Sequence, residues 1–290
     1  MDRSEFTVGV IGGSGLYEMD GLTDVQEFAI ATPFGRPSDA YVSGVKDGVR
    51  LVFLPRHGRG HRVSPSEINY RANVWGMKAF GVDRLISVSA VGSMREDIVP
   101  GDFVVVDQFV DRTRHRADTF FEDGVVGHVL FADPVSQGVR EALLSAAETV
   151  GVRVHDGGTY LNMEGPQFST RAESNTYRGW GVDVIGMTNL TEARLAREAE
   201  LPFATVAMAT DYDCWHEGEE DVTVEAVIEI MRQNVGKARA LIAAAAPLLA
   251  AGEKDPCEEA LRYAIMSDPE RVPPATRDRL ERFVGRYRGA

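Results

Sequence analysis

Cysteine is scarce in this chain of 290 residues, where only Cys214 and Cys257 are present. Two cysteines cannot build a disulfide framework or a thiolate metal cluster. The most apolar tract, residues 240–251, is too short to span a bilayer and contains Pro247. No basic stretch leads into an apolar segment at the N-terminus, so no signal peptide is predicted. We therefore expect a cytoplasmic protein with reduced thiols.

Positive charge is also in deficit, with 31 Lys and Arg against 44 Asp and Glu and a formal net charge of −13. Broad binding to nucleic acid or to an anionic membrane needs a basic face, so neither partner is expected. A small local anion site remains compatible with this balance. The hydrophobic share of 44% and the charged share of 26% are typical of a soluble globular protein.

Short apolar, β-branched runs alternate with helical patterns along most of the chain, which predicts an α/β fold with a central sheet flanked by helices. After Gly252 the composition changes to two charged helical stretches around a Pro-Pro break. We predict a single domain over residues 1–251, and a helical C-terminal tail over 252–290 packed on the body or on a neighbouring subunit. The expected strands are 7–11, 51–54, 85–88, 103–106, 181–185 and 203–208; the expected helices are 65–80, 136–150, 169–180, 191–199 and 224–246.

A glycine-rich turn follows the first predicted strand in "VGVIGGSGLY", residues 8–17. Glycines let backbone N–H groups converge on an anion, and Ser14 adds a hydroxyl donor. The dinucleotide-binding fingerprint fails here, because Glu18 stands where its third glycine should be. No GxxxxGK[ST] phosphate-binding loop occurs in the chain either. The turn is therefore a candidate site for a simple anion.

A basic turn, "LPRHGRGH", follows another predicted strand. Arg56 offers a planar fork of donors suited to an oxyanion, and His57 can donate from one ring nitrogen. His57 and His61 are four residues apart, but the glycines between them oppose the helix that a zinc pair would need. We therefore expect no metal. A solvated basic turn is the alternative interpretation, above all for Arg59 and Arg62.

A third strand-end loop, "SVSAVGSM" over residues 87–94, again carries small hydroxyl-bearing residues. Three such loops and one arginine would make a compact pocket for an inorganic oxyanion. Two acids, Asp211 and Asp213, follow the strand 203–208. They can bind Mg²⁺, accept hydrogen bonds from a purine or, when protonated, give a proton to its N7. A plain turn or helix-capping pair is the alternative.

Two further segments could contact a sugar. "NMEGPQFSTRAES" contains Ser169, and "GVDVIGMTNLTEARLA" sets Met187 and Thr188 at a strand end. Methionine packs well over a furanose ring, and a threonine hydroxyl can bridge sugar and anion. Each of these residues could equally belong to an ordinary core or cap.

Taken together, "GVIGGSGLY", "PRHGRGH", "EGPQFSTRAES" and "MATDYDCW" resemble the trimeric purine nucleoside phosphorylase family, and most of all its methylthioadenosine-cleaving branch. The resemblance covers about residues 6–250. It implies an α/β domain with a distorted mixed central sheet, and a homotrimer or dimer of trimers with sites near subunit boundaries. It also implies a pentosyltransferase that cleaves methylthioadenosine with phosphate to adenine and 5-methylthioribose 1-phosphate.

The resemblance also assigns residues. It places phosphate on Ser14, Arg56, His57, Ser89, Ala90 and Thr188; the ribose on Met187; adenine on Asp211 and Asp213 with Ser169 nearby; the 5′ group on Val224; and a contact from the adjacent subunit on His128.

Asp211 is the expected proton donor to N7, and Asp213 the expected reader of the exocyclic amino group. No metal and no organic cofactor is expected, since inorganic phosphate is a co-substrate. The same chemistry on a 6-oxopurine, methylthioinosine or inosine, is the first alternative. A non-catalytic purine-binding protein is a more remote one, because it would not need the phosphate residues.

Overall fold

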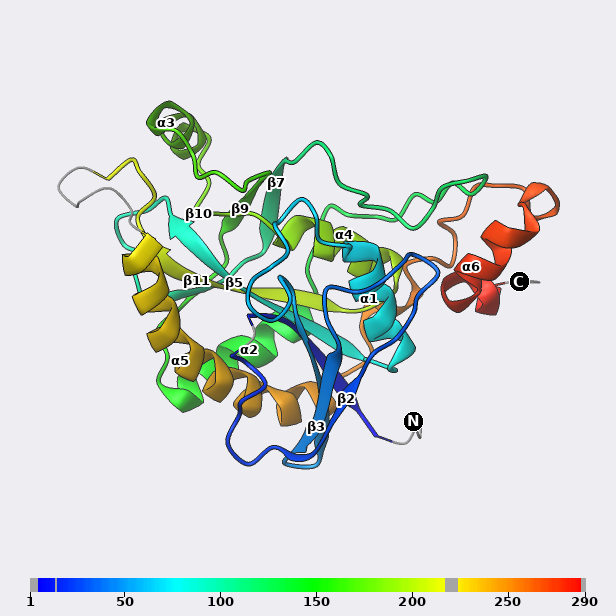
Figure 1. Ribbon diagram of the computed structural model, residues 1–290, viewed down its shortest axis with the longest axis horizontal. Coiled ribbons are helices and arrows are strands. Elements are labelled where there is room, and N and C mark those ends of the chain that lie inside the picture. Colours follow the sequence, from blue (N-terminus) through cyan, green and yellow to red (C-terminus); the bar gives the residue numbers. More distant parts are fainter. Residues whose placement is uncertain (1–4, 14, 217–223, 288–290) are drawn as a thin grey trace.

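The computed structural model describes residues 5–13, 15–216 and 224–287, with the backbone alone for 224–227 (Figure 1). Within these residues the strands form one eleven-stranded mixed sheet in which β2-β3-β4-β1-β5-β10-β9-β7 are consecutive neighbours and β11, β6 and β8 branch off β5. The strands are β1 (Thr7–Gly12), β2 (Thr23–Phe28), β3 (Tyr41–Lys46), β4 (Val49–Pro55), β5 (Arg84–Ser93), β6 (Phe103–Val105), β7 (Gln108–Arg112), β8 (Val154–Asp156), β9 (Thr159–Met163), β10 (Val184–Gly186) and β11 (Phe203–Asp211).

The long strand β5 causes the distortion of the sheet. Its first part pairs in parallel with β1 on one edge and with β11 on the other. Pairing with β1 ends at Ser87, and the last residues, Gly92 and Ser93, pair with the antiparallel strand β10, while pairing with β11 continues to Gly92. Because β1, β4, β5 and β11 run in the same direction, their carboxyl ends meet at one edge of the sheet. This is the edge at which open α/β sheets bind ligands.

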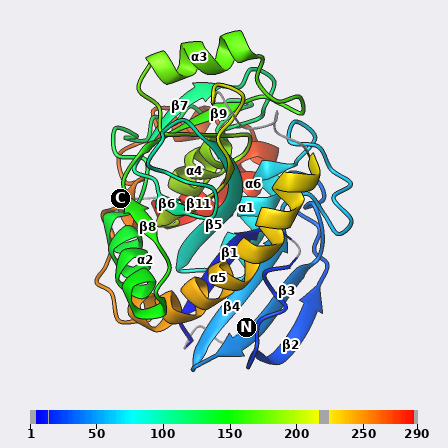
Figure 2. The same cartoon turned by 90° about the vertical axis from the view of Figure 1, so that its left-hand side faces the viewer.

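Helices cover the sheet on both sides (Figures 1 and 2). Helices α2 (Gln137–Val150) and α5 (Val224–Ala250) share one apolar cluster with β1, β5 and β11. Helices α1 (Tyr70–Ala79) and α4 (Asn189–Glu198) share a second cluster with α6 (Pro274–Val284). Helix α3 (Arg171–Gly179) lies at the end of the molecule beyond β9 and β10, as Figure 1 shows. Among the described residues, no helix is both long and apolar enough to cross a membrane.

Local sequence signals explain where the helices begin and end. Ser136 caps α2 by accepting from the backbone N–H of Val139, and Gly151 ends the helix with φ of 66°. Thr170 and Glu173 form a reciprocal capping box at the start of α3. The helix predicted from residue 65 begins only at Tyr70, because the residues before it form turns.

All six predicted strands are present, and so are the five predicted helices, with shifted ends. Strands β2, β3, β7, β8 and β9 were not predicted; β2 is almost wholly exposed and lacks an apolar run. In the tail, the second of the two predicted helical stretches is present as α6, but the first is not an α-helix. The first stretch forms only the 3₁₀ turns Pro256–Glu259 and Pro269–Arg271, each started by a capping aspartate and a proline.

The described part of the tail packs on the body of its own chain. Leu261, Leu280 and Phe283 are buried in one cluster with Phe120, and the Phe120 and Phe283 ring centroids are 4.4 Å apart. The buried Glu200 carboxylate accepts from the Leu261 backbone N–H at 2.9 Å and pairs with Arg286. Both apolar and polar contacts therefore hold residues 261–287 in place.

Candidate active site

Arg56 is the centre of the candidate site and follows directly after β4. Its backbone N–H donates to the Gly12 carbonyl at 2.9 Å, which holds the end of β4 against the end of β1. Its side chain turns into the protein and is only 3% exposed. Nε and Nη2 donate to the two carboxylate oxygens of Glu192, at 2.5 and 2.9 Å. This bidentate ion pair joins β4 to the first turn of α4.

The same guanidinium also holds the neighbouring strand ends. Nη1 donates to the Val88 carbonyl at 3.0 Å, and Nη2 reaches the Ile11 carbonyl at 3.3 Å and the Ser87 hydroxyl at 2.6 Å. Burial disfavours the charge on Arg56, but the Glu192 carboxylate outweighs this effect and raises the pKa of Arg56 above its ordinary value. Arg56 is therefore a fixed cation that ties β1, β4, β5 and α4 together.

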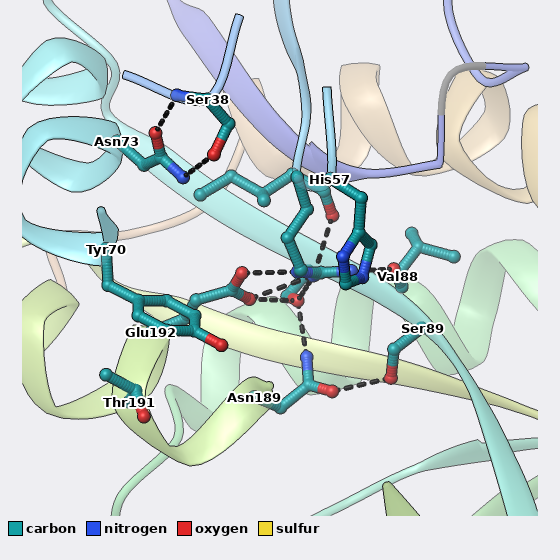
Figure 3. A network of polar contacts seen from close by, with 12 residues as sticks. Ser38, His57, Tyr70, Asn73, Val88, Ser89, Asn189, Thr191 and Glu192 are labelled. Carbon is teal, nitrogen blue, oxygen red and sulfur yellow. Dashed lines mark hydrogen bonds and ion pairs between the residues drawn. The ribbon is translucent and has the colours of Figure 1, made fainter. Parts of the chain in front are cut away.

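Glu192 is a member of the site that the sequence does not predict. Glu192 lies in the first turn of a helix, 136 residues from Arg56, and an acidic residue at that position is ordinarily explained by its favourable interaction with the helix dipole. In the structure Glu192 also accepts from the Ser87 hydroxyl at 2.6 Å. Asn189 then donates its amide N–H to Ser87, and its carbonyl oxygen accepts from the Ser89 hydroxyl at 2.5 Å (Figure 3). A continuous chain of polar side chains thus runs from Glu192 to Ser89.

His57 lies at the edge of this network. Its Nδ1 is 2.8 Å from the Val63 carbonyl oxygen, so Nδ1 carries the ring proton. Burial and the positive charge of Arg56 lower the pKa of His57 to about 4. His57 is therefore neutral at pH 7 and presents the lone pair of Nε2. Its ring stacks on that of His61, with ring centroids 4.3 Å apart. In the described parts of the chain, no group of three or more His, Cys, Asp or Glu residues is placed so that it could hold a metal ion.

The other expected phosphate residues lie at the same edge of the sheet or beside it. Ser89 and Ala90 are on β5, next to β11. Thr188 is the N-cap residue of α4, but its hydroxyl makes no capping hydrogen bond and so is not committed to the helix. Ser14 lies outside the described residues, directly after Gly13. Contacts of Arg56 with β5, and of Asn189 with Ser87 and Ser89, thus join the three chain segments that carry Arg56 and His57, Ser89 and Ala90, and Thr188.

The two expected base-binding acids differ in environment. Asp211 ends β11 and is half-buried; it accepts from the Thr210 hydroxyl at 2.7 Å and from the Asp213 backbone N–H at 3.0 Å. Asp213 is buried and accepts from the Ser174 hydroxyl of α3. Burial raises the pKa of Asp213, and the hydrogen bond from Ser174 offsets this only in part. Asp211 therefore stays the more accessible carboxyl of the pair.

The expected sugar residues lie nearby on loops that contact one another. The Ser169 carbonyl accepts from the Cys214 thiol at 3.3 Å, so the loop before α3 touches the loop after β11. Met187 follows β10, and its backbone carbonyl accepts from Arg116, a buried residue that the sequence reasoning missed. Val224 begins α5, but its side chain lies outside the described residues.

His128 lies elsewhere in this chain. It is exposed on the long segment after β7, and its backbone N–H donates to the Ala264 carbonyl of the tail at 2.9 Å. The structure does not place it with the strand-end residues of the same chain. Figure 1 shows this segment and the tail together at the far end of the molecule from α3 and α5.

Comparisons with a family model, with curated proteins and with solved structures point to the same family. Residues 7–247 match the model of the phosphorylase superfamily. The S-methyl-5′-thioadenosine phosphorylase of Geobacter sulfurreducens is 59% identical over 98% of this chain and 99% of its own, and that of Koribacter versatilis is 51% identical over 97% of both.

Solved structures agree with this. A methylthioadenosine phosphorylase from an Antarctic soil metagenomic library has a TM-score of 0.92 at 44% identity, over 96% of this chain and 99% of its own. A methylthioadenosine phosphorylase from Schistosoma mansoni in complex with adenine has a TM-score of 0.80 and is 40% identical over 85% of this chain and 93% of its own. The chain belongs to the phosphorylase superfamily and, within it, to the S-methyl-5′-thioadenosine phosphorylases.

Proposed function

We propose that this protein is a pentosyltransferase that cleaves S-methyl-5′-thioadenosine with phosphate, reversibly, to adenine and 5-methylthioribose 1-phosphate. The observation that carries the proposal is the pairing of two different sites at one edge of the sheet. Strand β5 would bear the hydroxyl and backbone groups of an oxyanion pocket. The adjacent parallel strand β11 ends at the carboxyl of Asp211, opposite Gly92 of β5, and a second carboxyl, Asp213, lies two residues further on. Membership of the family supplies the reaction that fits this pairing.

The phosphate is proposed to bind Ser14, Arg56, His57, Ser89, Ala90 and Thr188. Four of the five N–H groups of Arg56 face protein acceptors, and the second N–H of Nη1 remains for the anion. The uncommitted hydroxyl of Thr188 can donate to another oxygen. Since four of its five N–H groups are engaged by Glu192, Ser87 and backbone carbonyls, Arg56 supplies a fixed positive charge more than a bidentate hydrogen bond to the anion.

The nucleoside is proposed to bind across β11 and the loops beside it. Met187 would pack on the ribose, and Val224 would line the pocket for the 5′ substituent. Asp211 would donate a proton to N7 of the leaving base, since it is the more accessible acid and a bound purine would shield it from water. Asp213, with Ser169 nearby, would accept from the exocyclic amino group.

Catalysis would then rest on positioning and charge. Breaking the glycosidic bond builds positive charge on the ribose, so a phosphate anion held below the sugar stabilises the transition state and captures C1′. Protonation of N7 neutralises the leaving base. We propose no metal and no organic cofactor for this reaction, since inorganic phosphate is the second substrate.

We further propose that the enzyme is cytoplasmic and works as a homotrimer or a dimer of trimers. The site of one subunit would receive His128 from its neighbour. The exposed position of His128, away from the strand-end residues of its own chain, supports this assignment. Sedimentation of the purified protein tests it: a monomer with full activity would contradict the shared site.

The test of the reaction compares four nucleosides: methylthioadenosine, methylthioinosine, adenosine and inosine, each with and without phosphate. Release of adenine from methylthioadenosine only in the presence of phosphate is the expected result. Preference for the inosine compounds would keep the phosphate site but overturn the roles given to Asp211 and Asp213. No turnover of any of the four would leave a purine-binding protein as the better account.

A further inference from the structure

Hydrogen-bond direction in the buried network is fixed at one end by Glu192. A carboxylate paired with an arginine can only accept hydrogen bonds. The hydroxyl of Ser87 lies 2.6 Å from Glu192 Oε2 and 2.6 Å from Arg56 Nη2. Because Arg56 can only donate, the single hydroxyl proton of Ser87 must point at Glu192. Ser87 has no proton left for any other neighbour.

The direction then passes through Asn189. Ser87 can only accept from Asn189, so the amide NH₂ of Asn189 faces Ser87 and its carbonyl oxygen faces Ser89. The hydroxyl proton of Ser89 is therefore donated to Asn189 at 2.5 Å. Ser87, Asn189 and Glu192 are each 0% exposed and Ser89 is 7% exposed, so bulk water cannot exchange for these partners. A donor or acceptor left without a partner in such a place is strongly disfavoured, because water cannot replace the missing bond.

Ser89 consequently offers lone pairs, not a proton, to the phosphate pocket. We propose that Glu192, acting through Ser87 and Asn189, makes the pocket accept a hydrogen bond from a hydroxyl of the bound anion, and so select phosphate over anions of the same shape without a hydroxyl. The inference rests on the proposed function for the identity of the anion. At neutral pH both ionic forms of inorganic phosphate carry at least one P–OH group, whereas sulfate carries none.

The neighbours of Ser89 agree with this polarity. The Nδ1 proton of His57 is held by the Val63 carbonyl, so Nε2 of the neutral ring is a second acceptor. In the view of Figure 3, His57 and Ser89 lie on one side of the network and Glu192 on the other. Donors remain for the other anion oxygens, from Thr188 and from Nη1 of Arg56. Such a mixture of donors and acceptors matches hydrogen phosphate and mismatches sulfate.

The test measures binding of inorganic phosphate and of sulfate to the full-length protein by titration calorimetry at one pH and ionic strength. The wild type should bind phosphate roughly ten-fold or more tightly than sulfate, the factor that one mismatched buried hydrogen bond gives. Equal affinities would overturn the proposal.

Ser87→Ala supplies the decisive variant. Without the Ser87 hydroxyl the amide of Asn189 can turn, so that its NH₂ faces Ser89 and frees the Ser89 proton for the anion. The ratio of phosphate to sulfate affinity should fall toward one, mainly because sulfate binds better. An unchanged ratio would contradict the relay. Ser89→Ala, at the accessible end, should also lower the ratio by weakening phosphate alone, which keeps the idea testable if Ser87→Ala folds poorly.

Glu198→Gln is the matched control, since Glu198 is a second buried glutamate of α4 whose carboxylate accepts from Phe120 and Thr119 on a distant segment. It should leave the anion ratio unchanged. Turnover of methylthioadenosine is measured in parallel on the wild type. If the wild type turns over methylthioadenosine but binds phosphate and sulfate equally, this inference is wrong and the proposed function stands. If it prefers phosphate but does not turn over methylthioadenosine, the proposed function is wrong and this inference stands.

Discussion

Replacing Arg56 by methionine should remove a large part of the stability of the protein. The change leaves the Glu192 carboxylate buried without its cation and deprives the Val88 and Ile11 carbonyls of a donor. Breaking one side of a buried ion pair costs about 3–5 kcal/mol. A domain has only about 5–15 kcal/mol in total, so Arg56→Met should unfold at a much lower urea concentration than the wild type.

The double variant Arg56→Met/Glu192→Leu decides whether the loss comes from the pair. Replacing both charges by apolar side chains of similar size leaves no buried charge, and such exchanges are often neutral or stabilising. The double variant should therefore be more stable than Arg56→Met by about 3 kcal/mol or more, a strong coupling between the two sites. Urea unfolding without phosphate, followed by tryptophan fluorescence, is measured on the wild type, Arg56→Met, Glu192→Leu and the double variant. If the double variant loses as much free energy of unfolding as the two single variants together, Arg56 and Glu192 are not coupled and the prediction is wrong.

The same double variant separates stability from function. It regains the fold but not the fixed cation, so its KM for phosphate should stay at least ten-fold above the wild-type value while its KM for the nucleoside changes little. A double variant with wild-type phosphate KM would show that the charge of Arg56 does not act on the anion.

Three further outcomes are expected. Burial raises the pKa of Glu198 from 4.5 to about 7, so between these pH values the folded state keeps a proton that the unfolded state loses. The free energy of unfolding should therefore fall by roughly 3 kcal/mol as pH rises from about 4.5 to 7. Urea titrations at several pH values should show a smaller fall for Glu198→Gln. Asp211→Asn should lower kcat/KM about 10²-fold or more, whereas Asp213→Asn should shift preference toward methylthioinosine, as competing-substrate assays would show; the reverse pattern would exchange their roles. Glu200→Ala should expose residues 261–287 to protease before the body is cut, and unchanged cleavage would argue against Glu200 as their anchor.

Much of the fold could be predicted because its central strands are continuous apolar runs. Strands such as β1 and β11 are buried along nearly their whole length, and their sequences show it. The edge strand β2 could not be predicted, because its residues "TDVQEF" are mostly exposed and are fixed by pairing with β3. The first part of the tail was mistaken for a helix, since charge and periodicity do not reveal that capping aspartates and prolines close it into short turns.

The sequence indicates where a candidate residue lies when the signal is one short motif, but it does not reveal contacts between residues far apart in the chain. The position of Arg56 after a strand placed it correctly at the sheet edge. Its partner Glu192 is 136 residues away and gave no sign in the sequence of facing an arginine. The direction of the Ser89 hydroxyl depends on that partner as well. The sequence thus indicates candidate residues for the site, but it does not show which of their hydrogen-bond donors are already engaged within the protein.

The measurement that bears most directly on the central claim is the phosphorus product of the reaction. Protein, methylthioadenosine and inorganic phosphate are mixed, and ³¹P resonances are followed together with adenine release. A sugar 1-phosphate signal should grow in step with adenine, one for one, and should grow about ten-fold or more slowly in the Arg56→Met/Glu192→Leu variant at low phosphate. Adenine released with no loss of inorganic phosphate would show that water is the nucleophile, and would contradict the function proposed for this site.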